Sequence, residues 1–265
     1  MIPNEMHIPL LEAKGLSVDF VKQGRPISIL KQVNFALYPQ KTLGIVGESG
    51  SGKTVTALTI LNLIPSPPLL GISGEILFNG VNLLQCSKKK LRTIRGRQIA
   101  YIFQEPMTAL NPVLTIGEQI VEMIRAHQAI ERKAAWHKAV RLLSEVGLSS
   151  PDQRMKNYPH ELSGGMRQRA MIAMALSCDP EILIADEPTT ALDVTIQAQV
   201  LDLFKALIAS RGMSILFVTH DLSVMAEIAD DLLMMKDGAV VESGAIETVF
   251  DHPRHPYTQE LLSLI

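Results

Sequence analysis

The chain has 265 residues, of which 47% are hydrophobic, and its formal net charge is −2. This composition is typical of a globular protein, and it gives no electrostatic reason to expect a nucleic acid as partner. The only two cysteines, Cys86 and Cys178, lie far apart in segments that we expect to be folded. The sequence therefore indicates neither a disulfide framework nor a cysteine-rich metal cluster, and it fits a reducing compartment.

The first residues, MIPNEMHIPLLEAKG, lack the basic start and the apolar core of a signal peptide. Two early segments, EAKGLSVDF and VNFALYP, alternate between apolar and polar residues, which predicts an antiparallel β region. Four later runs are almost continuously apolar, as expected of strands that are covered on both faces. They are TLGIVG (42–47), QIAYIFQ (98–104), EILIADE (181–187) and SILFVTH (214–220). Their alternation with helical stretches predicts an α/β fold with a mainly parallel sheet.

The longest uncharged run, from Val55 to Gly74, has about the length of a membrane span. It contains Pro65, Pro67 and Pro68, which interrupt helices, so we expect a short helix followed by a turn. A basic stretch, KKKLRTIRGR (88–97), could touch phosphates or lipid headgroups. A solvated helix face is the better interpretation of such a charge run.

Between Glu105 and Glu161 the strand pattern is absent and the apolar residues have helical spacing. Gly147 follows one of these stretches and is a typical helix stop. We therefore expect a helical subdomain that is inserted between two strands of the core.

A glycine-rich loop, GESGSGKT, lies between the first continuous strand and a helix. It fits the pattern G-x-x-x-x-G-K-[ST], in which glycines let backbone N–H groups face phosphates. Lys53 would neutralise β- and γ-phosphate charge, and the Thr54 hydroxyl would bind Mg²⁺. The predicted phosphate-binding residues are Gly47, Glu48, Ser49, Gly50, Ser51, Gly52, Lys53 and Thr54.

Two acidic residues, Asp186 and Glu187, follow the apolar run ILIA at the end of another predicted strand. A phosphate-bound Mg²⁺ needs a carboxylate from a neighbouring strand, and Asp186 supplies it. Neighbouring side chains of an extended chain point in opposite directions. Glu187 is therefore available to accept a proton from an attacking water.

Two further strand ends carry polar side chains. His220 closes the strand ILFVT, where it could bind the γ-phosphate or hold the attacking water. Gln104 ends the strand YIF, from where its amide could reach a metal or that water. The two histidines of DHPRHPY, His252 and His255, lack the rest of a metal-ligand set, so we interpret them as structural.

A second phosphate-binding pattern occurs in HELSGGMRQRAMIAMAL (160–176). Its small polar turn, Ser163-Gly164-Gly165, precedes a helix, and free N–H groups at a helix start favour a phosphate. This turn lacks a lysine like Lys53 and a metal ligand, so it is a poorly equipped phosphate site by itself.

Six motifs, taken in order, resemble those of ATP-binding-cassette (ABC) ATPases. GESGSGKT, Gln104, LSGGMRQR, ILIADEP, ALD (191–193) and His220 resemble the Walker A, Q-loop, signature, Walker B, D-loop and H-loop motifs. The resemblance implies one nucleotide-binding domain over residues 1–265. Residues 1–104 and 180–265 would form the α/β core and a β subdomain, and about 105–179 the helical subdomain.

The same resemblance implies that two cassettes, identical or homologous, enclose ATP and Mg²⁺ head to tail. Each ATP would lie between the P-loop of one chain and Ser163, Gly164 and Gly165 of the other, close to Asp193. Phe20, at the end of the first predicted strand, would stack on the adenine, although a place in the core is an equally good interpretation.

Finer features resemble the peptide and nickel importer group of these ATPases. They are FQEPMTALNP, Met166 in the signature, and the C-terminal HPRHPYTQELLSLI. The resemblance implies a peripheral subunit at the cytoplasmic face of the membrane, where two integral permease subunits and, indirectly, an extracytoplasmic substrate-binding protein are its partners. The chain lacks the cysteine-rich motif of some members, so we expect no iron–sulfur cluster. Peptide and nickel remain open as cargo.

Other classes of ATPase or GTPase fit the sequence less well or lack a transporter. An unrelated P-loop kinase or GTPase leaves LSGGMRQR and ALD unexplained, and a chromosome-maintenance ATPase needs a long heptad segment that this sequence lacks. An ABC-type ATPase that acts in regulation or assembly, without a transporter, is the alternative that the sequence is least able to exclude. Association with membrane subunits would distinguish it from a transporter ATPase.

Overall fold

The computed structural model describes residues 8–190 and 193–264. They form two compact units. The first holds the described residues of Met1–Leu91 and Ser214–Ile265, and the second is Arg92–Met213. The second unit thus includes two of the apolar strand runs as well as the helical stretch.

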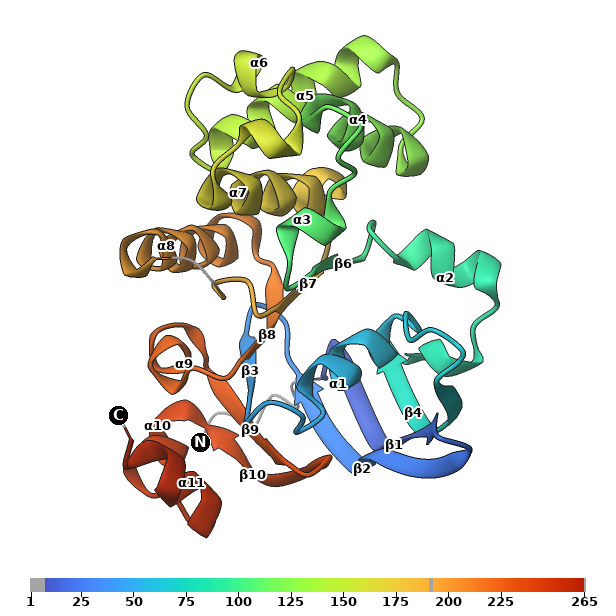
Figure 1. Ribbon diagram of the computed structural model, residues 1–265, viewed down its shortest axis with the longest axis vertical. Helices are drawn as coiled ribbons and strands as arrows, with labels where there is room; N and C mark the ends of the chain where they lie inside the picture. Colours follow the sequence, from blue (N-terminus) through green and yellow to red (C-terminus); the bar gives the residue numbers. More distant parts are fainter. Residues whose placement is uncertain (1–7, 191–192, 265) are drawn as a thin grey trace, which may run out of the picture. The chain divides into compact units, whose positions relative to one another are not determined.

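A mainly parallel set of strands lies at the centre of the first unit (Figure 1). β3 (Thr42–Val46) lies between β8 (Ser214–Thr219) and β9 (Asp231–Lys236) and is parallel to both. β10 (Ala239–Ala245) extends the sheet antiparallel to β9. Every residue of β3 and β8 is buried, as expected of apolar runs that are covered on both faces.

An antiparallel sheet forms the other β layer of this unit. β1 (Leu11–Lys22) pairs with β2 (Arg25–Leu37) and with β4 (Leu69–Phe78). β5 (Val81–Asn82) pairs antiparallel with β4. Buried and more exposed residues alternate at the start of β1, which gives the sheet one apolar face. The predicted antiparallel β region is confirmed.

Helices complete the first unit and include the short helix expected within Val55–Gly74. They are α1 (Lys53–Ile60), η1 (Leu83–Gln85), α9 (Leu222–Ile228), α10 (Ile246–Asp251) and α11 (Pro256–Leu262). Across residues 8–190 and 193–264, none of the helices combines the length and apolar character that a membrane crossing requires.

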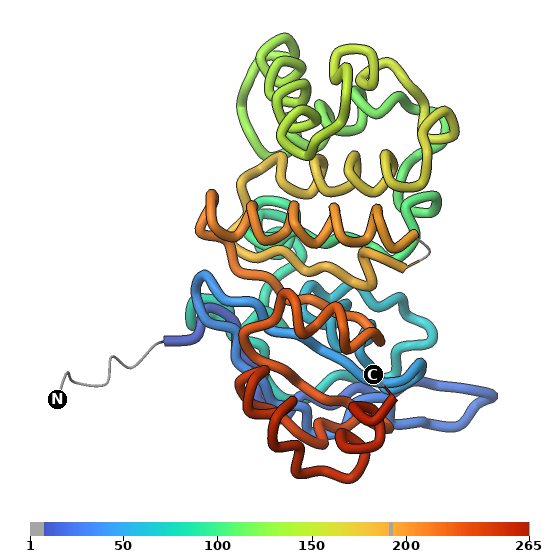
Figure 2. The backbone as a smooth tube through the Cα atoms, turned by 90° about the vertical axis from the view of Figure 1, so that its left-hand side faces the viewer, coloured from blue at the N-terminus to red at the C-terminus, as the bar shows by residue number. Residues whose placement is uncertain are grey.

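The second unit combines two parallel strands with helices (Figures 1 and 2). β6 (Ile99–Ile102) pairs with β7 (Ile182–Asp186). From Pro106 to Cys178 every element is helical, and α8 follows β7. These helices are α3 (Pro106–Ala109), α4 (Ile116–His127), α5 (Arg132–Glu145), α6 (Pro151–Arg154), η2 (Pro159–Glu161), α7 (Gly164–Ala175), η3 (Leu176–Cys178) and α8 (Val194–Arg211).

Local sequence signals explain where the helices of the second unit begin and end. Thr115 and Glu118 form a reciprocal capping box at the start of α4, which satisfies two backbone N–H groups. Gly147, with a φ of 76°, follows α5 as the expected stop. The α/β fold class predicted from the sequence is confirmed.

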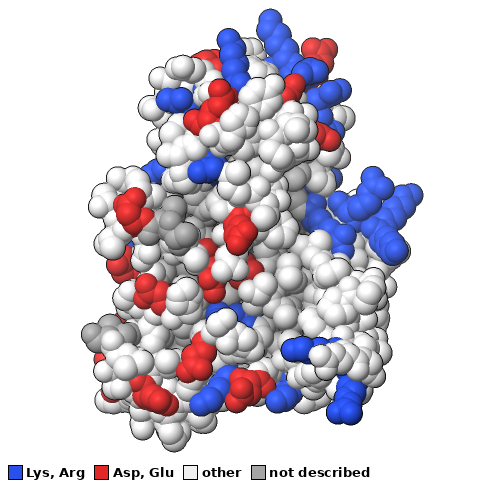
Figure 3. Space-filling view, in the orientation of Figure 1, with Lys and Arg blue, Asp and Glu red and all other residues white. Residues whose placement is uncertain are grey.

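The basic stretch forms α2 (Lys88–Ile94) and the turn after it. Leu91 and Ile94 are buried, whereas Lys88, Lys89 and Lys90 are exposed. Figure 3 shows the lysine and arginine side chains gathered at this helix. The helix is therefore amphipathic, with a solvated basic face.

Candidate functional site

The glycine-rich loop of the first unit follows β3 directly and ends at α1. A side chain at Gly47 would collide with the carbonyl oxygen of Met235. At Gly52, which caps α1 with a φ of 102°, a Cβ atom would lie 2.7 Å from Leu30 Cδ2. Backbone conformation and close packing thus both require glycine at these two positions.

Lys53 lies inside the curl of this loop. Its side chain is 4% exposed, and its Nζ donates hydrogen bonds to the carbonyl oxygens of Gly47 at 2.7 Å and Glu48 at 3.0 Å. The Ser51 hydroxyl is also buried and has no hydrogen-bond partner within the described chain. A buried ammonium, an unsatisfied hydroxyl and the N-terminus of α1 in one loop fit a phosphate group.

His220 follows β8 at the same edge of the sheet as the glycine-rich loop. Val46 of β3 is paired with Thr219 of the parallel strand β8, so Gly47 and His220 are the next residues of neighbouring strands. The structure therefore places His220 beside the beginning of the loop. Phe20 lies elsewhere, half-buried in β1 and paired with Ile27 and Leu69 of the antiparallel sheet.

Asp186 ends β7 in the second unit and is 2% exposed. The Tyr101 hydroxyl, from the neighbouring strand β6, donates a hydrogen bond to Asp186 Oδ2 at 2.8 Å. Burial, and then the negative charge of Asp186, raise the pKa of Tyr101 far above its ordinary value. Tyr101 therefore remains a neutral donor that fixes this carboxylate.

Glu187 is held by two donors in the same unit. The Gln104 amide nitrogen and the Thr190 hydroxyl both donate to Glu187 Oε2 at 2.9 Å. Glu187 has a φ of 46°, a left-handed conformation that is uncommon for a residue with a side chain. Such conformations occur often at functional sites, where the surroundings maintain them. The structure thus brings together two predicted site residues, Gln104 and Glu187.

The signature turn lies at the start of α7 in the second unit. The Ser163 hydroxyl accepts a hydrogen bond from the Met166 N–H at 3.3 Å and so caps the helix. Ser163 and Gly164 are exposed, and a Cβ atom at Gly164 would meet no neighbour within 4 Å. At Gly165, in contrast, a Cβ atom would lie 2.8 Å from Ile196 Cγ2. The turn is open at its tip and closely packed behind it.

The two arginines after this turn have structural partners. Arg169 donates from Nη1 to the Val146 carbonyl at 2.6 Å and from Nη2 to Gln199 at 3.0 Å. Arg167 donates to the sulfur of Met107 at 2.6 Å. Both arginine side chains therefore bind other segments of the second unit, whereas Lys53 binds carbonyl groups of its own loop.

Asp193 begins α8 and accepts a hydrogen bond from the Ile196 N–H at 2.9 Å, so its carboxylate caps that helix. The two residues before it in the ALD motif, Ala191 and Leu192, lie outside the described residues.

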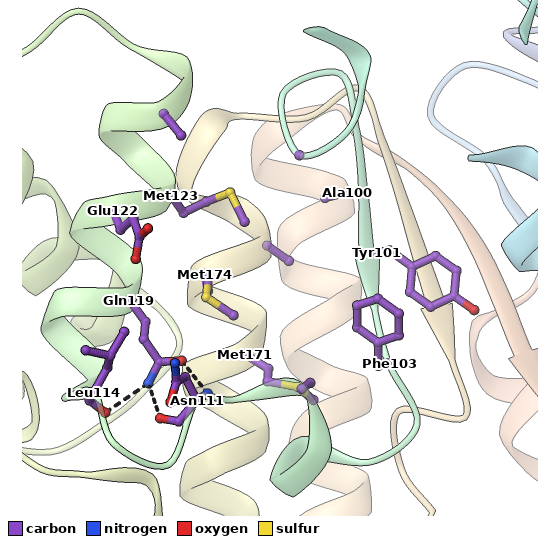
Figure 4. Close-up of a pocket in the computed structure, with 14 residues that line it drawn as sticks. Ala100, Tyr101, Phe103, Asn111, Leu114, Gln119, Glu122, Met123, Met171 and Met174 are labelled. Carbon is purple, nitrogen blue, oxygen red and sulfur yellow. Dashed lines mark hydrogen bonds between the residues drawn. The ribbon is translucent and has the colours of Figure 1, made fainter. Parts of the chain in front are cut away.

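An apolar cavity of about 450 Å³ lies within the second unit, beside the segment that follows Gln104 (Figure 4). Phe103, Met123, Met171 and Met174 contribute to its lining. Gln119, which is buried, holds the loop at its edge: its amide donates to the carbonyls of Asn111 and Leu114 and accepts from the Asn111 N–H. The cavity thus has soft, polarisable walls and a fixed polar rim.

Comparison with known proteins decides the family. The family model described as ABC transporter matches residues 30–190. The chain belongs to the ABC transporter family. This ABC ATPase is 51% identical over 254 residues to the "Oligopeptide transport ATP-binding protein OppD" of Bacillus subtilis, covering 96% of this chain and 71% of that one. It is 48% identical over 256 residues to the "Probable peptide ABC transporter ATP-binding protein y4tR" of Sinorhizobium fredii, covering 97% and 76%.

A solved structure agrees with this assignment. The "Dimeric structure of a post-hydrolysis state of the ATP-binding cassette MJ0796 bound to ADP and Pi" has a TM-score of 0.79 and 27% identity, and the match covers 89% of this chain and 98% of that one. The resemblance to ABC ATPases that the motifs predicted is confirmed. The ABC ATPase binds and hydrolyses ATP and is the ATP-binding subunit of an ABC transporter.

Two residues that hold the acidic pair Asp186 and Glu187 were not predicted from the sequence. They are Tyr101 and Thr190. Tyr101 is a polar aromatic residue within an apolar strand, and a buried tyrosine hydroxyl usually has a hydrogen-bond partner. That signal could have been used once Asp186 was placed on a neighbouring strand. Thr190 carried no comparable signal.

Proposed function

We propose that this ABC ATPase powers the import of peptides across the cytoplasmic membrane. The observation that carries the proposal is the 51% identity to an oligopeptide transport ATP-binding protein over 96% of the chain. The relative from Sinorhizobium fredii is also named for peptides. Nickel, which the sequence motifs left open, is the second cargo that the transport assay has to examine.

The P-loop residues Gly47–Thr54 would hold the phosphates of ATP. The collision that any side chain would make at Gly47, together with the buried Lys53 ammonium, supports this role. Mg²⁺ would be bound by the Thr54 hydroxyl, the Asp186 carboxylate and the Gln104 amide oxygen, a set of oxygen donors that suits this ion. When bound, the ion would neutralise charge that develops on the phosphates.

Glu187 would accept the proton of the attacking water. Its carboxylate is held at one oxygen by Gln104 and Thr190, which would orient it toward the water before the reaction begins. His220, next to the P-loop, would bind the γ-phosphate or the water. Phe20 would contact the adenine.

A second cassette would complete each ATP site. The exposed tip of the signature turn, with the Ser163 hydroxyl and open space at Gly164, supports an encounter with a phosphate that another chain holds. Asp193 would lie beside the same interface. The related cassette bound to ADP and Pi is dimeric by its title. The second cassette is either a copy of this chain or a homologous subunit.

Two cassettes that close around ATP would move relative to their partners. The segment from Gln104 to Pro112 would transmit this movement to two integral permease subunits. Three large apolar side chains are exposed in and around this segment: Phe103 is 43% exposed, Met107 48% and Val113 75%. Together with the apolar cavity they offer a surface for part of a permease subunit. The ABC ATPase would then lie at the cytoplasmic face of the membrane, indirectly served by a substrate-binding protein.

The test is co-purification of the tagged chain with detergent-solubilised integral membrane subunits, followed by ATPase assays of the complex in liposomes. We expect integral subunits to be recovered and peptide, in the presence of the binding protein, to stimulate ATP hydrolysis. Stimulation by nickel in place of peptide would contradict the proposed cargo. Recovery of the chain without any integral subunit would favour the regulatory or assembly ATPase instead.

A further inference from the structure

The C-terminal helix reaches the P-loop within the first unit. Tyr257, in the first turn of α11, is 3% exposed. Its hydroxyl oxygen accepts a hydrogen bond from the backbone N–H of Glu48 at 3.0 Å, although the two residues are 209 positions apart in the sequence. Glu48 is the second residue of the P-loop, and the motif that contains Tyr257 has no role in the function proposed so far.

The bond from Tyr257 acts on a peptide group that also binds Lys53. The N–H of Glu48 and the carbonyl of Gly47 belong to the same planar peptide unit. Tyr257 accepts from its N–H, and Lys53 Nζ donates to its carbonyl oxygen at 2.7 Å. The orientation of this peptide group is thus fixed from both sides, and one rigid plane connects the tyrosine hydroxyl to the lysine ammonium.

The segment before Tyr257 is attached to the same sheet as the P-loop strand. Glu242 of β10 accepts hydrogen bonds from the backbone N–H groups of Arg254 at 2.8 Å and His255 at 3.0 Å. His255 Nδ1 in turn accepts from the Tyr257 N–H at 3.2 Å and caps α11. Since β10 pairs with β9, and β9 with β3, the support of Tyr257 and the start of the loop share one sheet.

The hydroxyl is held in its neutral form and the ring is packed. Burial raises the pKa of Tyr257 above its ordinary value, so the group is protonated at neutral pH. The ammonium of Lys236 lies 4.4 Å from the centroid of the ring, a favourable cation–π distance. Tyr257 is therefore a fixed acceptor and does not act as an acid or base near neutrality.

We infer that Tyr257 is a positioning residue for ATP, which sets the Gly47–Glu48 peptide and through it the place of Lys53 in the P-loop. The inference rests on the proposed role of residues Gly47–Thr54 in holding the phosphates. Without the hydroxyl, the Glu48 N–H loses its acceptor and the peptide group is held only at its carbonyl, by Lys53. Lys53 would then have to be ordered by ATP itself, which weakens binding.

The test is Tyr257→Phe, which removes the hydroxyl and keeps the ring and its contact with Lys236. We expect the KM for ATP to rise about three- to tenfold, the effect of one hydrogen bond, while kcat at saturating ATP stays within about twofold. Tyr38→Phe, which removes a tyrosine hydroxyl next to β2 in the same unit, is the matched control and should leave KM unchanged. Glu242→Gln should also raise the KM for ATP, but by a smaller factor, because it weakens the hydrogen bonds that hold the segment before α11.

A merely structural contact would give a different result: the melting temperature of Tyr257→Phe would fall while its KM stayed at the wild-type value, which would overturn the inference. Lys53→Ala separates this outcome from a failure of the proposed P-loop site. If Lys53→Ala loses ATP affinity and Tyr257→Phe does not, only the role of Tyr257 is wrong. If Lys53→Ala binds ATP like the wild type, the phosphate site is wrong and the inference falls with it.

Discussion

The P-loop and the signature turn are alike in sequence and different in structure. Both place small residues before a helix, α1 in one case and α7 in the other. The P-loop encloses a buried lysine and an unsatisfied serine hydroxyl, and two of its glycines, Gly47 and Gly52, are closely packed. The signature turn has an exposed serine that caps its helix, and open space at Gly164. The difference supports the proposal that the P-loop holds the phosphates of ATP, whereas the turn completes a site that another chain supplies.

The largest effect is expected on kcat, from a change at Glu187, which lies outside both loops. ATP binding at the P-loop should be preserved. Glu187→Gln keeps the size of the side chain and removes its ability to accept a proton. We expect kcat to fall about 10²- to 10⁴-fold while ATP affinity stays within about twofold. Single-turnover hydrolysis and nucleotide-binding titration measure the two quantities. Normal turnover in this variant would show that Glu187 is not the base.

The next effect separates the two loops directly. Ser163→Arg fills the open tip of the signature turn, so we expect ATP hydrolysis to fall about 10²- to 10³-fold, as when a donor to the reacting phosphate is lost. ATP binding to the monomer should remain. Ser149→Arg, the same change at another exposed position of the second unit, is the control and should leave hydrolysis unchanged. Hydrolysis retained in Ser163→Arg would contradict the shared site.

A smaller effect, on ATP affinity, is expected from the different surroundings of Lys53 in the P-loop and Arg169 after the signature turn. Lys53→Ala should weaken ATP binding about 10- to 100-fold, since it removes a charged donor to the phosphates. Arg169→Ala should leave ATP affinity unchanged and lower the free energy of unfolding by about 1 kcal/mol, since it removes a hydrogen bond to the Val146 carbonyl. Equal losses of ATP affinity in both variants would remove the distinction.

The smallest expected difference is in the free energy of unfolding, between substitutions at Gly47 of the P-loop and Gly164 of the signature turn. Gly47→Ala should lower the free energy of unfolding by about 1–3 kcal/mol, because its Cβ would collide with the Met235 carbonyl. Gly164→Ala should change it by less than about 0.5 kcal/mol, because the new methyl group meets open space. Urea denaturation of both variants measures the difference. A similar loss in both would mean that the two loops are packed alike.

Local patterns in the sequence were sufficient for the glycine-rich loop and for part of the strands, whereas β4, β5, β9 and β10 were not predicted. Continuous apolar runs predicted β3, β6, β7 and β8, because strands that are buried on both faces need apolar side chains at every position. The motif order was sufficient for the family, which a family model and relatives confirm.

Contacts between distant segments could not be predicted in this way. Tyr101 with Asp186, Gln104 with Glu187 and Tyr257 with Glu48 each join residues at least 83 positions apart. Their existence depends on which strands become neighbours, and hydrophobic periodicity does not contain that information. The boundaries of the compact units, at Arg92 and Met213, likewise depend on tertiary contacts and not on helix content.

The most direct test of shared ATP sites is a mixing experiment with two impaired chains, at an ATP concentration at which the wild-type chain hydrolyses ATP and the weakly binding Lys53→Ala does not. Lys53→Ala has an intact signature turn, and Ser163→Arg has an intact P-loop. In a mixed dimer, one of the two sites combines the intact halves. We predict that an equimolar mixture regains ATPase activity, up to about a quarter of the wild-type sites if the chains pair at random. A mixture that is no more active than the sum of its two components would contradict the account.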